Sequence, residues 1–518
     1  MPLRIFLPDL LVAGLTLAFA WASAAFVWQP TLATFADDSV SYLVMAQVFS
    51  PYQPASQAVA AAFPREAFYP PLFPLVLALA GAAHDVAWAH VLTALLLAAT
   101  IPLVYRLGIR WLEDRRSAAV AAFSVALLPS LWVNAKGILS EPLFCLLLLA
   151  TFWALEEGPR NKLWLLALLM AAMVLTRTAA LPMIAVYALW AIARRGKRWH
   201  AVGPAFVAFA AYALWVLLRP AATADDYARI VIEQADMYLR AQSFLASAGE
   251  SLSKQANAVA EGWIGSLMLF WVEGRPARVV LAAAVGCLAL AGMALRLLDG
   301  KADAWMTAGY LATFLVWPFY EQMGRFLFPI LPVLLLYAFV AAVRAMQALR
   351  RPPGIAYGLL AALLLSLTVP ALAFIYQRAQ APGRYAEIVD WYRTPGLDEA
   401  RARAQVHLDL FSDMDDMRKL TRAEDRVMWV APAYLALLAD RRGVPAPASR
   451  LAPEEYRRAV RESSAGYVFL SVYHPRDTLR DAAWQAGTRA LAGHARAVHA
   501  RAGGEGGVVT SILLQVER

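Results

Sequence analysis

The chain of 518 residues is 60% hydrophobic and only 16% charged, and its formal net charge is +9. About 25% of the residues of an ordinary soluble protein are charged. Many apolar runs in this chain are long enough for a transmembrane helix, so the composition excludes a soluble protein and indicates a polytopic membrane protein. Lys and Arg gather in short clusters between these runs, which is typical of topology signals and argues against a nucleic-acid-binding surface.

The N-terminal segment predicts a transmembrane helix over residues 7–28. Arg4 precedes this run, which is longer than the apolar part of a typical signal peptide. We therefore expect an uncleaved first helix with a cytoplasmic N-terminus. The two cysteines, Cys145 and Cys287, both fall in later apolar runs and predict neither a disulfide framework nor a zinc site.

Further apolar runs predict an alternating series of about eleven spans. The turns expected on the cytoplasmic side are basic, Arg296 and Lys301 among them, so the positive-inside rule supports the alternation. An odd number of spans places the C-terminal part of the chain on the extracytoplasmic side. The later spans are expected at 86–108, 117–133, 142–156, 163–175, 179–193, 201–218, 277–297, 303–320, 326–343 and 355–376.

Two large external loops are expected at residues 29–85 and 219–276. Within them the apolar runs 70–83 and 262–272 are too short to cross a hydrocarbon core of about 30 Å, so we expect them to lie along the membrane surface. The two acids of the second loop, at positions 225 and 226, are interpreted as a solvated pair.

Residues 377–518 differ in composition from residues 1–376 and predict a separate extracytoplasmic α/β domain. Short apolar runs alternate there with helical patterns, as in proteins whose strands are spaced by helices. Its histidines, including His407 and His499, lack metal-ligand spacing, and Asp413 and Asp416 are interpreted as solvated acids. Strands are expected at 427–430, 467–472 and 508–516, and helices at 385–425, 432–440, 453–463 and 478–491.

Two adjacent carboxylates, Asp37 and Asp38, follow the first span closely. The residues after them have the apolar spacing of an amphipathic interfacial helix. Either acid could cap that helix or simply be solvated. A carboxylate at this depth is also well placed to act as a base between a lipid-borne molecule and a polar one.

The segment FADDSVSYLVMAQVF, followed by AFYPPLFPLVLALAG, resembles the first external loop of the GT-C superfamily of glycosyltransferases, which use polyprenyl-phosphate sugars. The resemblance is to the branch of the protein O-mannosyltransferases and the lipid A aminoarabinose transferase, and it covers about residues 7–345. The matching residues of this loop are Asp38, Ser39, Tyr42, Leu43 and Ala46, then Tyr69, Pro70, Pro71 and Pro74. Further matches in order are Ser140-Glu141-Pro142-Leu143-Phe144, Leu175-Thr176-Arg177-Thr178 and Gly324-Arg325-Phe326-Leu327.

This resemblance implies inverting transfer of a sugar from polyprenyl phosphate to an acceptor hydroxyl at the extracytoplasmic face. Asp38 is the expected general base, with Asp37 as the second candidate. Arg177 and Arg325 are expected to bind the donor phosphate, because a guanidinium pairs bidentately with phosphate oxygens. Lys136 is a third candidate for that phosphate. The alternative for the two arginines is a topology charge that reaches outward to the membrane surface, and the alternative for Lys136 is a pairing with Glu141.

Other residues near the same helix ends are candidates for binding or orienting the acceptor. They are Glu141, Tyr42, Tyr69, Arg65 and Glu66. Glu141 has the alternative role of stabilising a helix N-terminus, and Tyr69 that of an interfacial anchor. A divalent cation, Mg²⁺ or Mn²⁺, held by Asp38 and Glu141 is left open, because the family also includes metal-independent members.

The sequence thus predicts an α-helical polytopic membrane protein, GT-C-like, of the bacterial inner membrane. The expected donor is a polyprenyl-phosphate sugar, and the expected acceptor is an envelope glycan, a glycolipid such as lipopolysaccharide, or a protein. A transporter or flippase of lipid-linked sugars is disfavoured, because the charged candidates collect at external helix ends and no repeat is evident. A noncatalytic envelope binding or assembly protein is the remaining alternative.

Overall fold

The fold was analysed in a computed structural model of the 518-residue chain. The structure describes residues 3–35, 38–156, 163–195, 201–220, 244–269, 276–316, 322–381, 383–472, 478–503 and 508–517. Asp37, the second candidate for the general base, lies outside these residues. The acidic pair at positions 225 and 226 lies outside them as well.

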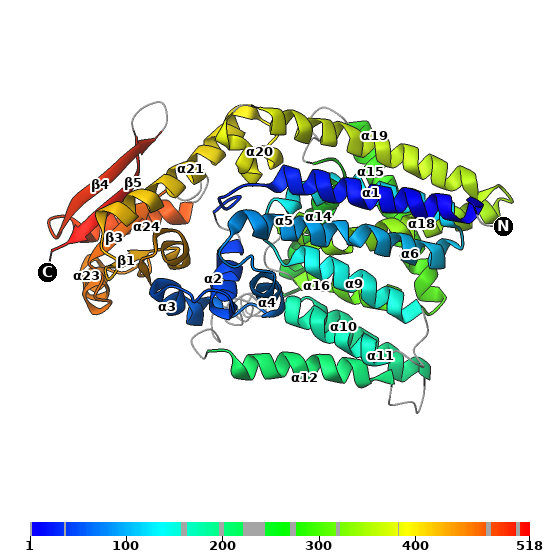
Figure 1. Ribbon diagram of the computed structural model, residues 1–518, viewed down its shortest axis with the longest axis horizontal. Coiled ribbons are helices and arrows are strands. Elements are labelled where there is room, and N and C mark those ends of the chain that lie inside the picture. Colours follow the sequence, from blue (N-terminus) through cyan, green and yellow to red (C-terminus); the bar gives the residue numbers. More distant parts are fainter. Residues whose placement is uncertain are drawn as a thin grey trace.

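A bundle of apolar helices forms most of the molecule and ends at a small sheet domain, with the two chain termini at opposite ends (Figure 1). Every expected span within the described residues coincides with a helix or with part of a bent helix pair. The helices of the bundle are α1 (Leu3–Val27), α5 (Val86–Ala98), α6 (Thr100–Leu112), α7 (Arg115–Ala126), α8 (Pro129–Ala135), α9 (Glu141–Glu156), α10 (Leu163–Thr176), α11 (Ala180–Arg195), α12 (Gly203–Leu218), α14 (Phe244–Met268), α15 (Pro276–Leu298), α16 (Ala302–Thr313), α17 (Met323–Leu327), α18 (Leu331–Ala348) and α19 (Pro353–Gln380).

Five of the described helical stretches are long and apolar enough to cross a membrane. They are Leu7–Val27, Val86–Leu112, Pro276–Leu298, Met323–Ala348 and Pro353–Gln380. A sixth would be the α7–α8 pair, which bends by 48°. Pro129 explains this bend, because a proline keeps the preceding residue out of the helical region, and Leu128 is indeed extended with ψ 122°. The chain is therefore a multi-pass membrane protein, while the predicted number of eleven spans stays a prediction.

The segment predicted as the first external loop, residues 29–85, is folded into three short helices at the end of the bundle that faces the sheet domain (Figure 1). They are α2 (Ser39–Phe49), α3 (Gln57–Glu66) and α4 (Leu72–Leu79). Eight consecutive residues of α2, Ser39 to Ala46, are buried, so this helix is a packed core element and not the half-exposed interfacial helix that the apolar spacing suggested. The part of the second loop that is described belongs to α14, which contains the predicted apolar run 262–272 up to Met268.

The C-terminal domain is α/β, as expected, and its five-stranded sheet has the order β2-β1-β3-β5-β4. Strands β1 and β3 are parallel neighbours, whereas β5 runs antiparallel to both β3 and β4. The three predicted strands are confirmed. Strands β2 and β4 were not predicted, because both are rich in Arg, Gly or Ala and lack an apolar run. The elements are η7 (Arg384–Glu387), α20 (Val389–Arg393), α21 (Leu397–Leu420), β1 (Arg426–Trp429), α22 (Pro432–Tyr434), η8 (Leu435–Ala439), β2 (Arg442–Pro445), α23 (Pro453–Glu462), β3 (Tyr467–Ser471), α24 (Thr478–Leu491), β4 (Ala495–Gly503) and β5 (Val508–Val516).

The two domains share a hydrophobic core. Side chains of the first external loop, such as Phe35 and Leu43, are buried in one cluster with Trp429 and Leu435 of the C-terminal domain. The ring of Phe35 lies 4.5 Å from that of Tyr434, centroid to centroid, in a stacked arrangement. The C-terminal domain is thus packed onto the loop that carries the predicted base.

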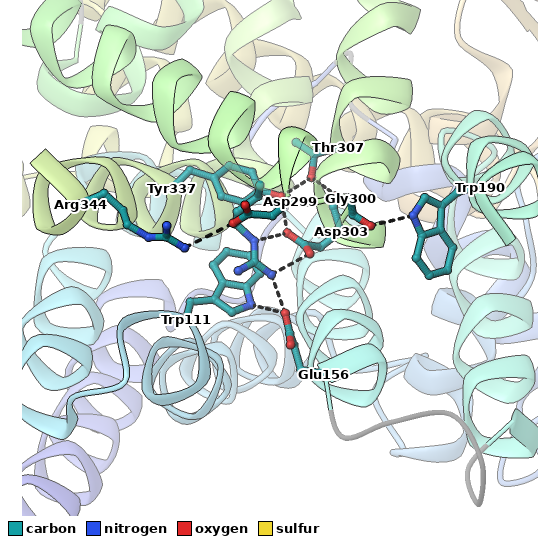
Figure 2. A network of polar contacts seen from close by, with 10 residues as sticks. Trp111, Glu156, Trp190, Asp299, Gly300, Asp303, Thr307, Tyr337 and Arg344 are labelled. Carbon is teal, nitrogen blue, oxygen red and sulfur yellow. Dashed lines mark hydrogen bonds and ion pairs between the residues drawn. The ribbon is translucent and has the colours of Figure 1, made fainter. Parts of the chain in front are cut away.

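A polar network joins side chains of α6, α9, α15 and α16 (Figure 2). Arg296, expected as an exposed cytoplasmic topology charge, is only 6% exposed. Its guanidinium donates to both carboxylate oxygens of Asp303, at 2.8 Å each, and to Glu156 at 2.5 Å. It also stacks over the ring of Trp111 at 3.9 Å. The expectation failed because the sequence does not reveal that two acids of other helices converge on this arginine.

A candidate active site at the end of the bundle

Four charged residues from separate helix ends meet beside the C-terminal domain. Asp38 immediately precedes α2, Glu141 is the first residue of α9, Arg177 follows α10, and Arg325 lies in α17. These four are the predicted base, the predicted orienting acid and two of the predicted phosphate-binding cations. The sequence placed each of them at the end of an apolar run, and the fold brings these ends together.

A continuous series of ion pairs joins the four side chains. Nη2 of Arg325 lies 2.5 Å from Oδ2 of Asp38, and its Nε donates to Oε1 of Glu141. The other oxygen of Glu141 lies 2.9 Å from Nη1 of Arg177. Arg325 therefore bridges the two carboxylates, and the formal charges of the four groups sum to zero.

The two carboxylates differ in accessibility. The Asp38 side chain is 23% exposed, whereas that of Glu141 is 1% exposed and lies between two guanidinium groups. Burial alone would raise the pKa of the Asp38 carboxyl, but the charge of Arg325 and the hydrogen bond from Tyr69 outweigh it and hold this pKa below its ordinary value. Asp38 is therefore an ionised carboxylate at neutral pH that a substrate can reach.

Two of the predicted tyrosines belong to the same cluster. The hydroxyl of Tyr69 donates to Oδ1 of Asp38 at 2.6 Å, and that of Tyr42 lies 2.8 Å from Oγ of Ser140. Ser140 in turn accepts from Nη1 of Arg177 at 2.9 Å. Burial and the neighbouring Asp38 carboxylate raise the pKa of Tyr69 well above its ordinary value, so this phenol keeps its proton and remains a donor.

Asp38 does not cap α2 with its carboxylate. Its backbone oxygen accepts from the N–H of Tyr42 at 3.1 Å, but its side chain makes no capping hydrogen bond. The capping alternative is therefore wrong for Asp38, and its carboxylate points to Arg325 and Tyr69. Glu141 does occupy the first turn of α9, where a negative charge favours the helix, so its stabilising role and an orienting role coexist.

A close approach of two glycines positions Arg325. Gly262 of α14 faces the backbone of Gly324, and a Cβ at Gly262 would lie 2.8 Å from the nitrogen of Gly324. Any larger residue at 262 would push away the short helix α17 that carries Arg325. The hydroxyl of Tyr310 adds a hydrogen bond of 2.8 Å to the backbone oxygen of Phe326 on the same helix.

Two further predicted residues, Glu66 and Arg65, lie around the cluster without a described contact to its charged groups. Glu66 accepts from Oγ of Ser41 at 2.5 Å, and burial raises the pKa of Glu66 although this hydrogen bond partly opposes the shift. Arg65 is directed to the C-terminal domain, where Nη1 lies 3.5 Å from the backbone oxygen of Gly443. Their predicted roles toward the acceptor stay predictions.

Lys136, the third predicted phosphate ligand, has described contacts to residues outside the four-residue charged cluster. Its Nζ donates to the backbone oxygen of Ala386 at 2.9 Å and to Oε1 of Gln29 at 3.3 Å. Burial lowers the pKa of Lys136 to about 8 despite the nearby Glu387. These contacts connect α8 to the segment that leads into the C-terminal domain.

The C-terminal domain contains the one group of described residues with the geometry of a metal site. Ligand atoms of Asp413, Asp416 and His499 lie within 4.8 Å of one another. Asp413 is 2% exposed, so the expectation of a solvated acid is wrong. Arg501 already donates to both acids, at 2.6 and 2.7 Å, which makes the group a charge network that a cation would have to enter.

Sequence reasoning missed a second group that supports the candidate base. Nδ1 of His407 accepts from the backbone N–H of Phe35 at 3.0 Å, and its Nε2 lies 3.0 Å from Oδ2 of Asp390. The one indication was that His407 falls on the buried, apolar side of helix α21. Histidines in such positions are common in proteins, so the position does not identify a role.

No protein-family model and no curated protein matches the chain in sequence. Solved structures match it in fold. ArnT from Cupriavidus metallidurans in the apo state has 12% identity and a TM-score of 0.53, and 97% of each chain is covered. The same protein bound to undecaprenyl phosphate has 13% identity and a TM-score of 0.51, with the same coverage.

A third structure is the oligosaccharyltransferase of Archaeoglobus fulgidus tethered to an acceptor peptide. It has 12% identity and a TM-score of 0.50, over 98% of this chain and 74% of the other. At these identities the comparisons show the fold alone. The predicted fold, a polytopic helical membrane protein with a C-terminal α/β domain, is shared with ArnT and is confirmed.

Proposed function

We propose that the protein is an inverting glycosyltransferase that moves a sugar from a polyprenyl-phosphate donor to an acceptor hydroxyl. The observation that carries this proposal is the Asp38 carboxylate, which is ionised, 23% exposed and ion-paired with Arg325. The ArnT fold supports it, because one of the matching ArnT structures holds undecaprenyl phosphate.

In the proposed reaction Asp38 is the general base. The acceptor hydroxyl gives its proton to the carboxylate while its oxygen forms a bond to the anomeric carbon of the donor sugar. The bond between that carbon and the phosphate oxygen breaks, and its electron pair leaves with the polyprenyl phosphate. Each carboxylate oxygen has more than one acceptor position, so Asp38 is able to receive the acceptor hydroxyl while Tyr69 and Arg325 stay bound.

The two arginines are proposed to bind the donor phosphate. A guanidinium has five N–H donors, and the described polar contacts of Arg325 use Nε and Nη2, whereas those of Arg177 use Nη1. Donors thus remain for phosphate oxygens, where negative charge grows as the leaving group departs. Glu141 is proposed to hold both guanidiniums in place and not to react, because it is 1% exposed.

A divalent cation between Asp38 and Glu141 does not fit the arrangement as it stands. The guanidinium of Arg325 occupies the position that bridges the two carboxylates, so a metal ion there would have to displace it. We therefore propose that cationic side chains stabilise the leaving phosphate. We place the protein in the bacterial inner membrane, with this end of the bundle on the extracytoplasmic side, in keeping with the positive-inside pattern.

The test is the isosteric variant Asp38→Asn. General-base catalysis contributes about 10²- to 10⁴-fold to a rate, so we expect sugar transfer to fall by at least about 100-fold. The measurement compares envelope glycolipids and glycoproteins by mass spectrometry in cells with the wild-type protein, the variant or neither. The control is Asp398→Asn, whose carboxylate is fully exposed and distant in sequence from the cluster.

A sugar present with the wild type and absent with Asp38→Asn supports the proposal, provided that the variant is folded and inserted at the wild-type level. Full transfer by the folded Asp38→Asn protein would exclude Asp38 as the base. Identical envelope profiles with and without the wild-type protein would favour a binding or assembly role instead.

A further inference from the structure

A cavity of about 620 Å³ lies between the helix bundle and the segment that enters the C-terminal domain. Its walls come from the first external loop, from α8, from α14, from the Gln322–Arg325 turn and from residues 389–407. This volume is in the range of small-molecule binding sites. The cavity therefore has room for a ligand of a few rings. Five separate parts of the chain form its walls.

The cavity adjoins the candidate active site. Arg325 lines it with one side and binds Asp38 with Nη2 at 2.5 Å. Phe35, three positions before the base, lines it as well. A molecule in this cavity therefore lies beside the side chain that binds the Asp38 carboxylate.

Two polar atoms in the cavity wall have no hydrogen-bond partner among the described residues. They are Oγ of Ser130 on α8 and Nε of Arg403 on α21. Ser130 is only 5% exposed, so its hydroxyl is buried without a protein partner. An unsatisfied buried hydroxyl costs free energy, and a ligand that hydrogen-bonds to it removes this cost.

We propose that this cavity binds the acceptor and that the acceptor is a glycan. The proposal rests on the function proposed above and names the substrate class of the same site. Asn134 and Asp390 line the cavity too; Oδ1 of Asn134 accepts from Arg393 at 2.9 Å, and Oδ2 of Asp390 lies 3.0 Å from Nε2 of His407. Amide and carboxylate oxygens accept more than one hydrogen bond, so both residues are able to receive sugar hydroxyls in addition.

The lining disfavours the two other candidates. A polyprenyl chain requires an apolar surface, whereas half of this wall is polar side chains such as Gln322 and His407. An extended peptide is bound most readily along a sheet edge, and none of the described lining residues belongs to a strand.

The test uses Ser130→Ala and Ser130→Leu in the full-length protein. The first removes the unpartnered hydroxyl, and the second fills part of the cavity. The matched control is Ser124→Ala on the adjoining helix, whose hydroxyl donates to the backbone oxygen of Val120 at 2.9 Å and does not line the cavity. The probe is the water-soluble glycan fraction released from the envelope of the cells that encode the protein. Binding is measured by ligand-observed NMR, with undecaprenyl phosphate as a second ligand.

We expect Ser130→Ala to weaken glycan binding about threefold to tenfold, the effect of one lost hydrogen bond, and Ser130→Leu to abolish it. Ser124→Ala should bind as the wild type does, and undecaprenyl phosphate should bind equally to all four proteins. Since Ser130→Ala removes an unsatisfied polar atom, its ligand-free unfolding temperature should equal or exceed that of the wild type. This keeps the test valid where Ser130→Leu fails to fold.

Wild-type glycan binding by both Ser130 variants would overturn the proposal. Loss of undecaprenyl phosphate binding in Ser130→Leu would assign the cavity to the donor, and a fraction of envelope peptides that binds in place of the glycans would assign it to a protein acceptor. Asp38→Asn separates this question from catalysis. Unaltered transfer by this variant contradicts only the proposed base, and wild-type glycan binding by both Ser130 variants contradicts only the cavity proposal.

Discussion

The backbone N–H of Phe35 donates to Nδ1 of His407, 372 positions later in the chain, at 3.0 Å. Because Nδ1 is an acceptor, the proton of the neutral imidazole is on Nε2, where Oδ2 of Asp390 lies 3.0 Å away and is able to accept it. A carboxylate from one end of the C-terminal segment thus orients a histidine that holds the loop of the candidate base.

From this relationship we predict that His407→Ala lowers kcat by about tenfold. The variant removes the hydrogen bond from the buried N–H of Phe35 to Nδ1, which costs about 1–3 kcal/mol and loosens the loop that ends at Asp38. His407→Asn keeps an acceptor near the position of Nδ1 and should recover part of kcat. Affinity for undecaprenyl phosphate, measured with purified protein, should be the same in both variants. An unchanged kcat for His407→Ala would contradict the positioning role.

The charged cluster could be predicted from the sequence because each member stands at the end of an apolar run. Alternation across a membrane places every second run end on one face, so Asp38, Glu141, Arg177 and Arg325 were assigned to one side before any contact was known. Which ions pair could not be predicted, since the pairing depends on the directions of α9 and α17. The bridging position of Arg325 between two acids is a property of the fold.

His407 and Arg296 show where sequence reasoning stops. His407 acquires its role from the N–H of Phe35, a backbone group that no side-chain pattern reports. Arg296 stands at the end of an apolar run, and this position predicts a topology charge. In the structure its guanidinium is buried and donates to Asp303 and Glu156. The contacts of His407 with Phe35 and of Arg296 with Glu156 join elements that are distant in sequence, and a single sequence carries no signal for these.

The second prediction concerns the pH dependence of transfer by Arg325→Gln. A general base works in its ionised form, and the charge of Arg325 is the main influence that holds the pKa of Asp38 below its ordinary value. In the wild type the acid limb of kcat/KM from Asp38 should lie at a lower pH than the ordinary pKa of an aspartate would give. Without Arg325, burial raises the pKa of Asp38, so the limb should move to higher pH.

The measurement is the pH profile of kcat/KM for the wild type, Arg325→Gln and Arg177→Gln. Arg177 contributes the smallest of the effects that act on Asp38, so its loss should move the limb less. Equal acid limbs in the wild type and Arg325→Gln would show that the base is not the carboxylate bound to Arg325.

The third prediction concerns the stability of the cluster. Glu141→Gln removes the negative charge that holds two guanidiniums, whose side chains are only 12% and 13% exposed. An uncompensated buried charge costs about 3–5 kcal/mol, so we expect a large drop in the thermal unfolding temperature of the purified protein. Glu454→Gln is the control, because Glu454 is 84% exposed in its pair with Arg457. Similar unfolding temperatures for the two variants would mean that Glu141 is not a structural partner of the arginines.

The fourth prediction separates stability from catalysis with the network at the far end of α9. Glu141 begins this helix in the candidate active site and Glu156 ends it in the Arg296 network (Figure 2), roughly 22 Å away at 1.5 Å per residue. Arg296→Met leaves the buried carboxylate of Asp303 and the partly buried carboxylate of Glu156 without their cation, and it should destabilise the protein by about 3–5 kcal/mol. Because the network does not contact Asp38, kcat of the folded fraction should equal that of the wild type.

Arg344→Met is the matched control in the same region. The pair of Arg344 with Asp299 is 3.3 Å long, and the side chains are 58% and 44% exposed. An exposed pair contributes about 0–1 kcal/mol, so this variant should unfold close to the wild-type temperature. A lower kcat in folded Arg296→Met would indicate that the two ends of α9 are coupled, and equal stability of the two arginine variants would show that the buried network does not hold the bundle together.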